Sequence, residues 1–178
     1  YDLYCKMLNE AVRHLKGEGG EEGYNTTIDL SLDAYIPDSY IPNEYHKLDI
    51  YKRIAAIESE EDMEEMTEEL IDRFGEFPKK VEMLLLVARL KALAHEAYVT
   101  QIEQKGDTYT FLMYERAKVA PERIPELLLQ FREELSFKAD AEHPCFIYRK
   151  KKKNGKEKGE NPADVVKKVL IGIKGLIA

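Results

Sequence analysis

Acidic side chains are the most concentrated source of chemistry in this sequence of 178 residues. From Glu58 to Asp72 the chain carries nine acids and no base. Carboxylates act as general acids when a desolvated pocket raises the pKa of one of them. A run of charge this dense predicts a solvated face instead. Ion pairing is therefore the chemistry that these residues can perform.

The spacing of the acids places most of them on one side of a predicted helix over residues 60–74. At 100° per residue, four acids fall within about 60° of one another, and the apolar residues lie opposite. The four are Glu61, Glu65, Glu68 and Asp72, which we call the acidic stripe. Glu69 lies beside the stripe, as an i, i+3 neighbour of Asp72. Ser59 and Asp62 resemble a capping pair at the helix start, and Gly75 ends the helix.

An acidic stripe held stiffly by its apolar back forms a rigid ion-pairing surface. Its natural partner is an arginine face, because guanidinium and carboxylate groups meet in a bidentate fork. Exposed pairs contribute about 0–1 kcal/mol each, so several of them bind a free partner weakly. Linkage within one polypeptide supplies a roughly millimolar effective concentration. The sequence therefore predicts an intramolecular or weak docking module.

Other kinds of site lack candidates. The segment Gly17–Gly23 has no GK[ST] and follows a predicted helix, unlike a phosphate-binding loop. The four histidines show neither HxxxH nor HxH spacing, which argues against a metal site. Cys5 and Cys145 have no CxxC partner and no neighbouring base, as expected of buried thiols in a reduced, cytoplasmic protein. We therefore expect no cofactor and no metal, and these residues offer no catalytic candidate, although an enzyme without a familiar motif stays open as a third interpretation.

A basic segment near the C-terminus offers an alternative function. The net charge of −7 disfavours nucleic-acid binding as a default. From Arg149 to Lys158, however, there are seven bases and one acid. A phosphate could be contacted by Lys150, Lys151, Lys152 and Lys153. Tyr148 is the aromatic residue beside them, and its ring could stack on a nucleobase. Two interpretations stay open, a solvated loop and a nucleic-acid-binding module over residues 149–158.

Apolar periodicity and turn signals predict the elements that position these residues. Predicted helices span residues 2–16, 44–57, 60–74, 78–97, a short stretch from Pro121 through Leu135, and 162–174. Predicted strands span residues 27–32, 99–104, 108–114, and short segments at Phe137 and 146–148. Lys105-Gly106-Asp107 is a hairpin turn between the second and third strands.

This order of elements predicts an α+β fold rather than a doubly wound α/β sheet. We expect a small mixed or antiparallel sheet, several packed helices and a long central helix near 78–97.

The longest apolar stretch, Met83–Ala88, is far too short to span a membrane. Because the chain begins inside a predicted helix, we expect a piece of a longer protein. Residues 1–16 would enter from a preceding domain, and residues 17–178 would form a single domain.

Four ordered motifs carry a family resemblance. They are Asp2-Leu3-Tyr4-Cys5-Lys6-Met7-Leu8 with Glu10-Ala11-Val12, Asp33-Ala34-Tyr35-Ile36-Pro37-Asp38 with Tyr40-Ile41-Pro42, Tyr51-Lys52-Arg53-Ile54-Ala55, and Glu69-Leu70-Ile71-Asp72-Arg73-Phe74-Gly75. Together they resemble the C-terminal domain of bacterial transcription-repair coupling factors. The similarity covers roughly the first 95 residues, and further on it concerns the order of the elements more than the residues. The segment Lys150–Lys158 departs most from the family pattern.

The resemblance implies a large cytoplasmic parent, an ATP-driven DNA translocase that removes stalled RNA polymerase and recruits the nucleotide-excision-repair protein UvrA. This domain would carry no ATPase. It would dock on the parent's UvrB-like N-terminal module, mask the UvrA-binding surface and help to repress the motor. RNA polymerase and DNA would be reached through the parent. In the family, acids of the E-L-I-D-R-F-G motif meet arginines of that module, and in this sequence those acids are Glu69 and Asp72.

Overall fold

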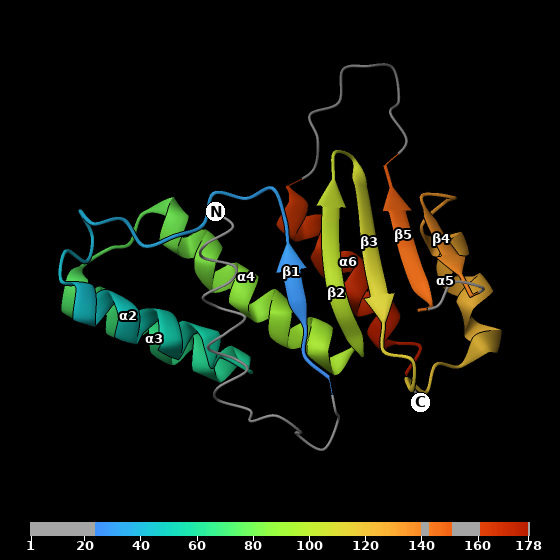
Figure 1. Cartoon of the computed structure of the whole chain (residues 1–178), viewed down its shortest axis with the longest axis horizontal. Helices are drawn as coiled ribbons and strands as arrows, with labels where there is room; N and C mark the ends of the chain where they lie inside the picture. Colours follow the sequence, from blue (N-terminus) through green and yellow to red (C-terminus); the bar gives the residue numbers. More distant parts are fainter. Residues whose placement is uncertain (1–23, 140–142, 151–160, 178) are drawn as a thin grey trace. The chain divides into compact units, whose positions relative to one another are not determined.

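The computed structural model describes residues 24–139, 143–150 and 161–177 (Figure 1). Its helices are α2 (Glu44–Ala55), α3 (Glu60–Phe74), α4 (Lys79–Glu96), the 3-10 helix η1 (Pro121–Arg123), α5 (Ile124–Gln130) and α6 (Pro162–Lys174). Its strands are β1 (Thr27–Asp29), β2 (Val99–Lys105), β3 (Thr108–Met113), β4 (Leu135–Lys138) and β5 (Cys145–Arg149). The predicted α+β fold is confirmed. The helix predicted over residues 2–16 lies outside the described residues.

The described residues pack as two compact units. The first comprises residues 24–27 and 32–92, and the second comprises residues 28–31 and the described residues from 93 onward. Helix α4 contributes residues to both units. The prediction of a helix over 1–16 followed by a single domain over 17–178 stays a prediction, because residues 1–23 are not described.

In the first unit, helix α2 is held by hydrogen bonds near both of its ends. Asn43 caps its start, since the side-chain oxygen accepts a hydrogen bond from the His46 N–H at 3.0 Å. Near its end, the Tyr51 hydroxyl accepts from the buried Ile36 N–H at 2.8 Å. This bond holds the proline-containing segment that precedes α2 against the helix and satisfies a buried backbone donor.

Helix α3 has the bounds that its capping residues predict. The Ser59 hydroxyl accepts from the Asp62 N–H at 3.1 Å, and the Asp62 carboxylate accepts from the Glu58 N–H at 3.0 Å. The helix stops at Gly75, whose φ of 85° and ψ of −172° lie in a region essentially reserved for glycine. Both ends of α3 are therefore set by local sequence.

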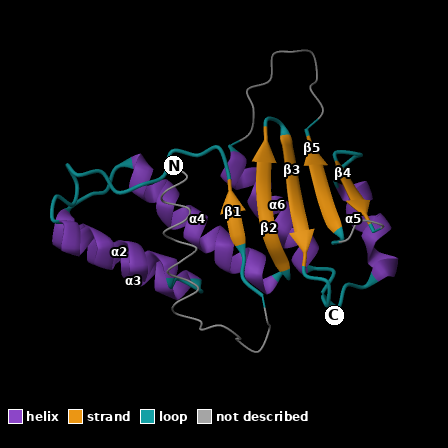
Figure 2. Ribbon diagram, viewed as in Figure 1, coloured by secondary structure: helices purple, strands orange, loops and turns teal. Residues whose placement is uncertain are grey.

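The second unit contains a five-stranded sheet within the described part of the chain, in the order β1-β2-β3-β5-β4. β2 pairs antiparallel with β3, β3 with β5, and β4 with β5. The arrow of β1 points the same way as that of β2, so the sheet is mixed, as predicted (Figure 2). Its buried centre is aromatic, with Phe111, Phe146 and Tyr148 fully enclosed.

The short helix predicted through Leu135 ends earlier than expected. α5 stops at Gln130, and Arg132 and Glu133 follow with φ of 49° and 68°. The Glu134 N–H then donates to the Phe131 carbonyl at 2.9 Å, which closes a tight turn. Leu135 instead begins β4, where it is buried opposite Tyr148. Burial in the sheet outweighs the local preference for helix.

Helix α6 matches its prediction and covers part of the sheet. Asn161 caps it by accepting from the Ala163 N–H at 3.0 Å, and Pro162 occupies its first turn. One side of the helix is buried, through Ala163, Val165, Val166, Val169, Leu170 and Ile173. The Lys168 ammonium lies 5.0 Å from the ring centre of Tyr148, so α6 packs on the face where that ring lies.

Candidate protein-docking surface

The acidic stripe of α3 lies on the exposed side of the helix. Glu61, Glu65, Glu68 and Asp72 are all exposed. On the opposite side Leu70 is fully buried and Met66 nearly so. The carboxylates are therefore carried on a helix whose position is fixed by its own core contacts. Among the described residues, these four acids have no hydrogen-bond or ion-pair partner.

Glu69 lies in a different environment from the stripe. Its carboxylate accepts hydrogen bonds from both terminal nitrogens of Arg53 on α2, with the Nη2–Oε1 distance at 2.7 Å. The Arg73 Nη1 atom lies 3.3 Å from the same carboxylate. The Glu69 side chain retains 31% exposure. Glu69 is thus already paired with two cations of its own chain.

The electrostatics of Glu69 follow from this pairing. The Arg53 hydrogen bond lowers the pKa of the Glu69 carboxyl below its ordinary value, and the charges of Arg53 and Arg73 act in the same direction against desolvation. The same bond raises the pKa of Arg53. The pair stays ionised at neutral pH, and it joins α2 to α3 by a bidentate fork.

Arg53 is the residue that the sequence interpretation missed. It belongs to the Tyr51-Lys52-Arg53-Ile54-Ala55 motif, which gave no role for its guanidinium. Its partner lies 16 residues further on and in another helix, beyond the reach of any i, i+3 or i, i+4 rule. The structure therefore separates the predicted docking residues into Glu69, which is neutralised, and Glu65, Glu68 and Asp72, which point to solvent.

The C-terminal end of α3 is held by Tyr40. Its hydroxyl lies 2.8 Å from the Gly75 carbonyl and 3.2 Å from the Leu70 carbonyl, and it donates to this pair of acceptors. The Tyr40 ring packs against Phe74 with ring centres 5.9 Å apart. These contacts satisfy carbonyls at the helix end and keep the turn that carries Asp72 in place.

A hollow of about 240 Å³ opens between α2 and α3 in the first unit. We call it the α2–α3 hollow. It is lined by Arg53, Ala56, Ile57, Asp62, Glu65 and Met66. Ile57 and Met66 give it an apolar floor, since both are about 4% exposed. The hollow lies beside the fork of Arg53 and Glu69.

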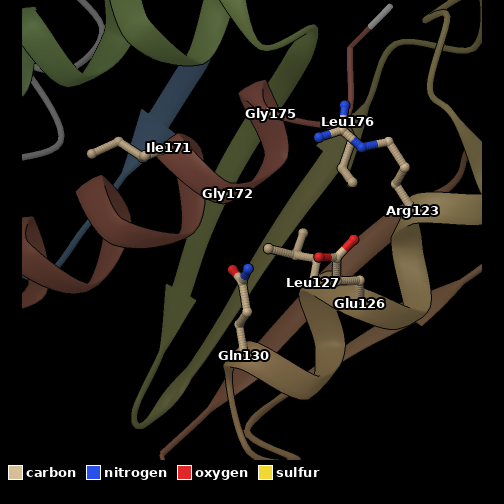
Figure 3. A pocket seen from close by; sticks show the side chains of 8 residues that line it. All are labelled: Arg123, Glu126, Leu127, Gln130, Ile171, Gly172, Gly175 and Leu176. Carbon is tan, nitrogen blue, oxygen red and sulfur yellow. The ribbon is translucent and has the colours of Figure 1, made fainter.

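A second hollow, of about 230 Å³, lies between α5 and α6 in the second unit (Figure 3). Leu127 reaches from α5 toward Gly172, where a Cβ atom would come within 2.6 Å of the leucine Cδ1. Glycine at this position lets the two helices approach closely. Arg123 and Glu126 stand at one side of the hollow, and both are exposed, as is Gln130, which also lines it. It explains helix packing rather than chemistry.

The basic segment is described only at its beginning. The Arg149 Nε–H donates to the Thr108 hydroxyl at 3.2 Å, at the end of the β3–β5 ladder. Lys150 is half-buried, and Lys151, Lys152 and Lys153 lie outside the described residues. Phosphate contact by these lysines stays a prediction.

Metal sites and membrane-spanning helices are two further features to consider in the described residues. Within residues 24–139, 143–150 and 161–177, no group of three or more His, Cys, Asp or Glu side chains is placed to hold a metal ion. In the same ranges, no helix has the length and apolar character to cross a lipid bilayer.

Comparison with known proteins identifies the family of this α+β chain. The family model described as the TRCF domain matches residues 30–124, more than half of the chain. The chain therefore belongs to the TRCF domain family, as the motifs predicted. The solved structure that the chain resembles is that of the C-terminal domain of a coupling factor.

The relatives agree with this assignment. The chain is 42% identical over 118 residues to the transcription-repair-coupling factor of Bacillus subtilis, covering 66% of this chain and 10% of that protein. It is 44% identical over 108 residues to that of Staphylococcus haemolyticus, covering 60% of this chain and 9% of that protein. The chain thus spans about a tenth of the length of these relatives.

A solved structure shows the same fold. The crystal structure of the C-terminal domain of a transcription-repair coupling factor superposes with a TM-score of 0.66 at 26% identity. The match covers 86% of this chain and 92% of that chain. The chain in that crystal structure therefore consists almost entirely of the matched domain.

Proposed function

We propose that this chain is the non-catalytic regulatory domain of an ATP-dependent DNA translocase that couples transcription to nucleotide excision repair. In this proposal it docks on the UvrB-like N-terminal module of the same cytoplasmic protein. Docking masks the surface that UvrA binds and helps to repress the motor. The proposal is carried by one observation: α3 holds, on a firmly packed helix, a row of exposed carboxylates that have no partner among the described residues.

The proposed docking is a two-state equilibrium within one polypeptide. Shifting such an equilibrium from 1:99 to 99:1 requires about 5.5 kcal/mol of differential binding. Exposed ion pairs contribute about 0–1 kcal/mol each, so a few of them on a tethered partner shift the equilibrium by less than this and leave the docking easy to reverse. Engagement of RNA polymerase or DNA by the parent can then reverse the docking.

Asp72 and Glu69 would take part in docking in different ways. Asp72 is exposed and has no partner among the described residues, so an arginine of the N-terminal module meets no competitor there. An arginine that approaches Glu69 meets Arg53 and Arg73 already in place. Glu69 therefore contributes by sharing its carboxylate or by exchanging partners, and Asp72 contributes directly.

A binding titration tests the proposal. The 178-residue chain is titrated with the separate UvrB-like N-terminal module of its parent by calorimetry. We expect Glu69→Ala combined with Asp72→Ala to leave the domain folded and to weaken binding about tenfold or more, since two charge-assisted contacts are lost. Glu82→Gln, which removes an exposed acid from α4, is the control and should change binding less than twofold.

The consequence for the full-length parent is an increase in UvrA binding. In a pull-down, the parent with both substitutions should retain more UvrA than the wild type, because the masked surface is exposed more often. Equal UvrA retention by the two proteins, together with unchanged affinity in the titration, would refute the proposed masking.

A further inference from the structure

The α2–α3 hollow has the dimensions of a site for a single side chain. Its volume of about 240 Å³ is below the range of roughly 300–1,000 Å³ of pockets that enclose drug-sized ligands. Its floor is apolar, through Ala56, Ile57 and Met66. Such pockets in protein interfaces commonly receive one anchoring side chain, most often an aromatic residue or arginine.

The walls of the hollow are electronegative. Asp62 and Glu65 line it one helical turn apart, and the Glu65 carboxylate has no partner among the described residues. The cation in the wall, Arg53, is committed to Glu69 and neutralised by it. Helix α2 also ends here, at Ala55, and a helix C-terminus carries partial negative charge. The uncompensated charge around the hollow is therefore negative.

We propose that the α2–α3 hollow receives one arginine side chain of the N-terminal module. The aliphatic stem of the arginine lies on Ile57 and Met66, and the guanidinium binds the Glu65 carboxylate and the free side of Asp62. This inference rests on the proposed function and deepens it, because it assigns a specific anchor to the N-terminal half of α3. The motif acids Glu69 and Asp72 lie in the C-terminal half.

Arginine fits the hollow better than lysine or an aromatic side chain does. Two carboxylates at i and i+3 can share the five donors of a planar guanidinium, whereas an ammonium group is a compact point charge. A long stem over an apolar floor removes additional apolar surface from water. An aromatic side chain would use the floor but would leave both carboxylates without a cation.

A matched pair of substitutions tests the charge. Glu65→Gln and Glu64→Gln remove the same charge from adjacent positions of α3, both exposed, and Glu64 does not line the hollow. In the titration with the N-terminal module we expect Glu65→Gln to weaken binding about tenfold and Glu64→Gln to weaken it less than twofold. Equal effects of the two variants would overturn the proposal.

A second variant tests the cavity without changing charge. Ala56→Leu fills the hollow from the exposed end of α2 and should weaken binding about tenfold, while the melting temperature of the domain stays the same. Unchanged or tighter binding by this variant would count against an occupied hollow.

The partner's arginine is found by charge reversal. Each arginine of the N-terminal module is changed to Glu and combined with Glu65→Arg in this chain. One pair should recover binding at least fivefold over either single change, and recovery by no pair would contradict the direct contact.

If wild-type chain and module fail to bind, the proposed function and this inference both fail. If only the Glu69 and Asp72 substitutions weaken binding, the function stands and this inference is wrong.

Discussion

Arg53 on α2 binds the carboxylate of Glu69 on α3 through both of its terminal nitrogens, across 16 residues of sequence. This fork occupies a residue that the proposed function assigns to docking. It joins the helix that carries the acidic stripe to its neighbour, and the four acids of the stripe, Glu61, Glu65, Glu68 and Asp72, stay exposed to solvent. In the proposed function, docking and the internal support of α3 thus share one carboxylate.

The fork should stabilise the domain modestly. In a double-mutant cycle with Arg53→Ala and Glu69→Ala we expect a coupling of about 0.5–1 kcal/mol, because the pair is partly exposed and partly screened. Urea denaturation of the four proteins measures this energy. Lys52→Ala, an exposed neighbour on α2, should show no coupling to Glu69→Ala. The absence of coupling between Arg53 and Glu69 would mean that the fork does not contribute to the free energy of unfolding in solution.

The contribution of Glu69 should depend on pH in one direction. Its pKa is lowered in the folded state from an ordinary value of 4.5, so the folded protein favours the ionised form. The stability that it adds is fully present above about pH 4.5 and is lost as the pH falls through the lower, folded-state value. The stability difference between wild type and Glu69→Gln should therefore shrink below pH 4.5. In an Arg53→Ala background this pH dependence should be weaker than in the wild-type background. The same pH dependence in both backgrounds would contradict the assignment of Arg53 as the main cause of the lowered Glu69 pKa.

Removal of the Tyr40 hydroxyl should loosen the end of α3. Tyr40→Phe keeps the ring contact with Phe74 and deletes the hydrogen bonds to the Gly75 and Leu70 carbonyls. We expect a loss of about 0.5–1.5 kcal/mol in the free energy of unfolding. Tyr45→Phe is the matched control, since Tyr45 is 85% exposed and has no partner among the described residues. Similar losses in both variants would show that the hydroxyl contacts are not specific.

Gly75 should tolerate substitution less well than Gly106 does. The two glycines have open space around the Cβ position, so differences between them report on the backbone. Gly75, with φ 85° and ψ −172°, lies in a glycine-only region. Gly106, with φ 59°, is near the left-handed conformation that asparagine adopts. We expect Gly75→Asn to lower the free energy of unfolding by about 1–3 kcal/mol and Gly106→Asn to change it by less. Thermal denaturation of both variants provides the comparison.

The proposed docking should weaken as salt is added. Its contacts are exposed ion pairs, and the Debye length falls from about 10 Å at 0.1 M salt to about 3 Å at 1 M. The Kd of the chain for the N-terminal module should rise about tenfold or more over this range. The Glu69→Ala, Asp72→Ala double variant should show a shallower salt dependence, because fewer pairs remain to be screened. Parallel slopes for the two proteins would place the salt-sensitive contacts elsewhere on the surface.

The sequence by itself determined the elements and the exposed acids. The bounds of α3 at residues 60 and 74 follow from Ser59, Asp62 and Gly75, and the exposure of Glu65, Glu68 and Asp72 follows from helical spacing. These are local properties, because capping and periodicity act within one or two helical turns. The motifs also predicted the family, which the comparisons confirmed.

Only the tertiary structure decided which acids of α3 are paired within the chain and which can bind a partner. The Arg53 partner of Glu69 and the support from Tyr40 join residues 16 or more positions apart in sequence, and the hollow is lined by residues from both sides of the turn between α2 and α3. The early end of α5 has the same origin, since Leu135 gains more by pairing in the sheet than by extending a helix. Contacts between elements depend on how their buried faces pack. A sequence pattern within one segment therefore does not specify which residues of two elements come into contact.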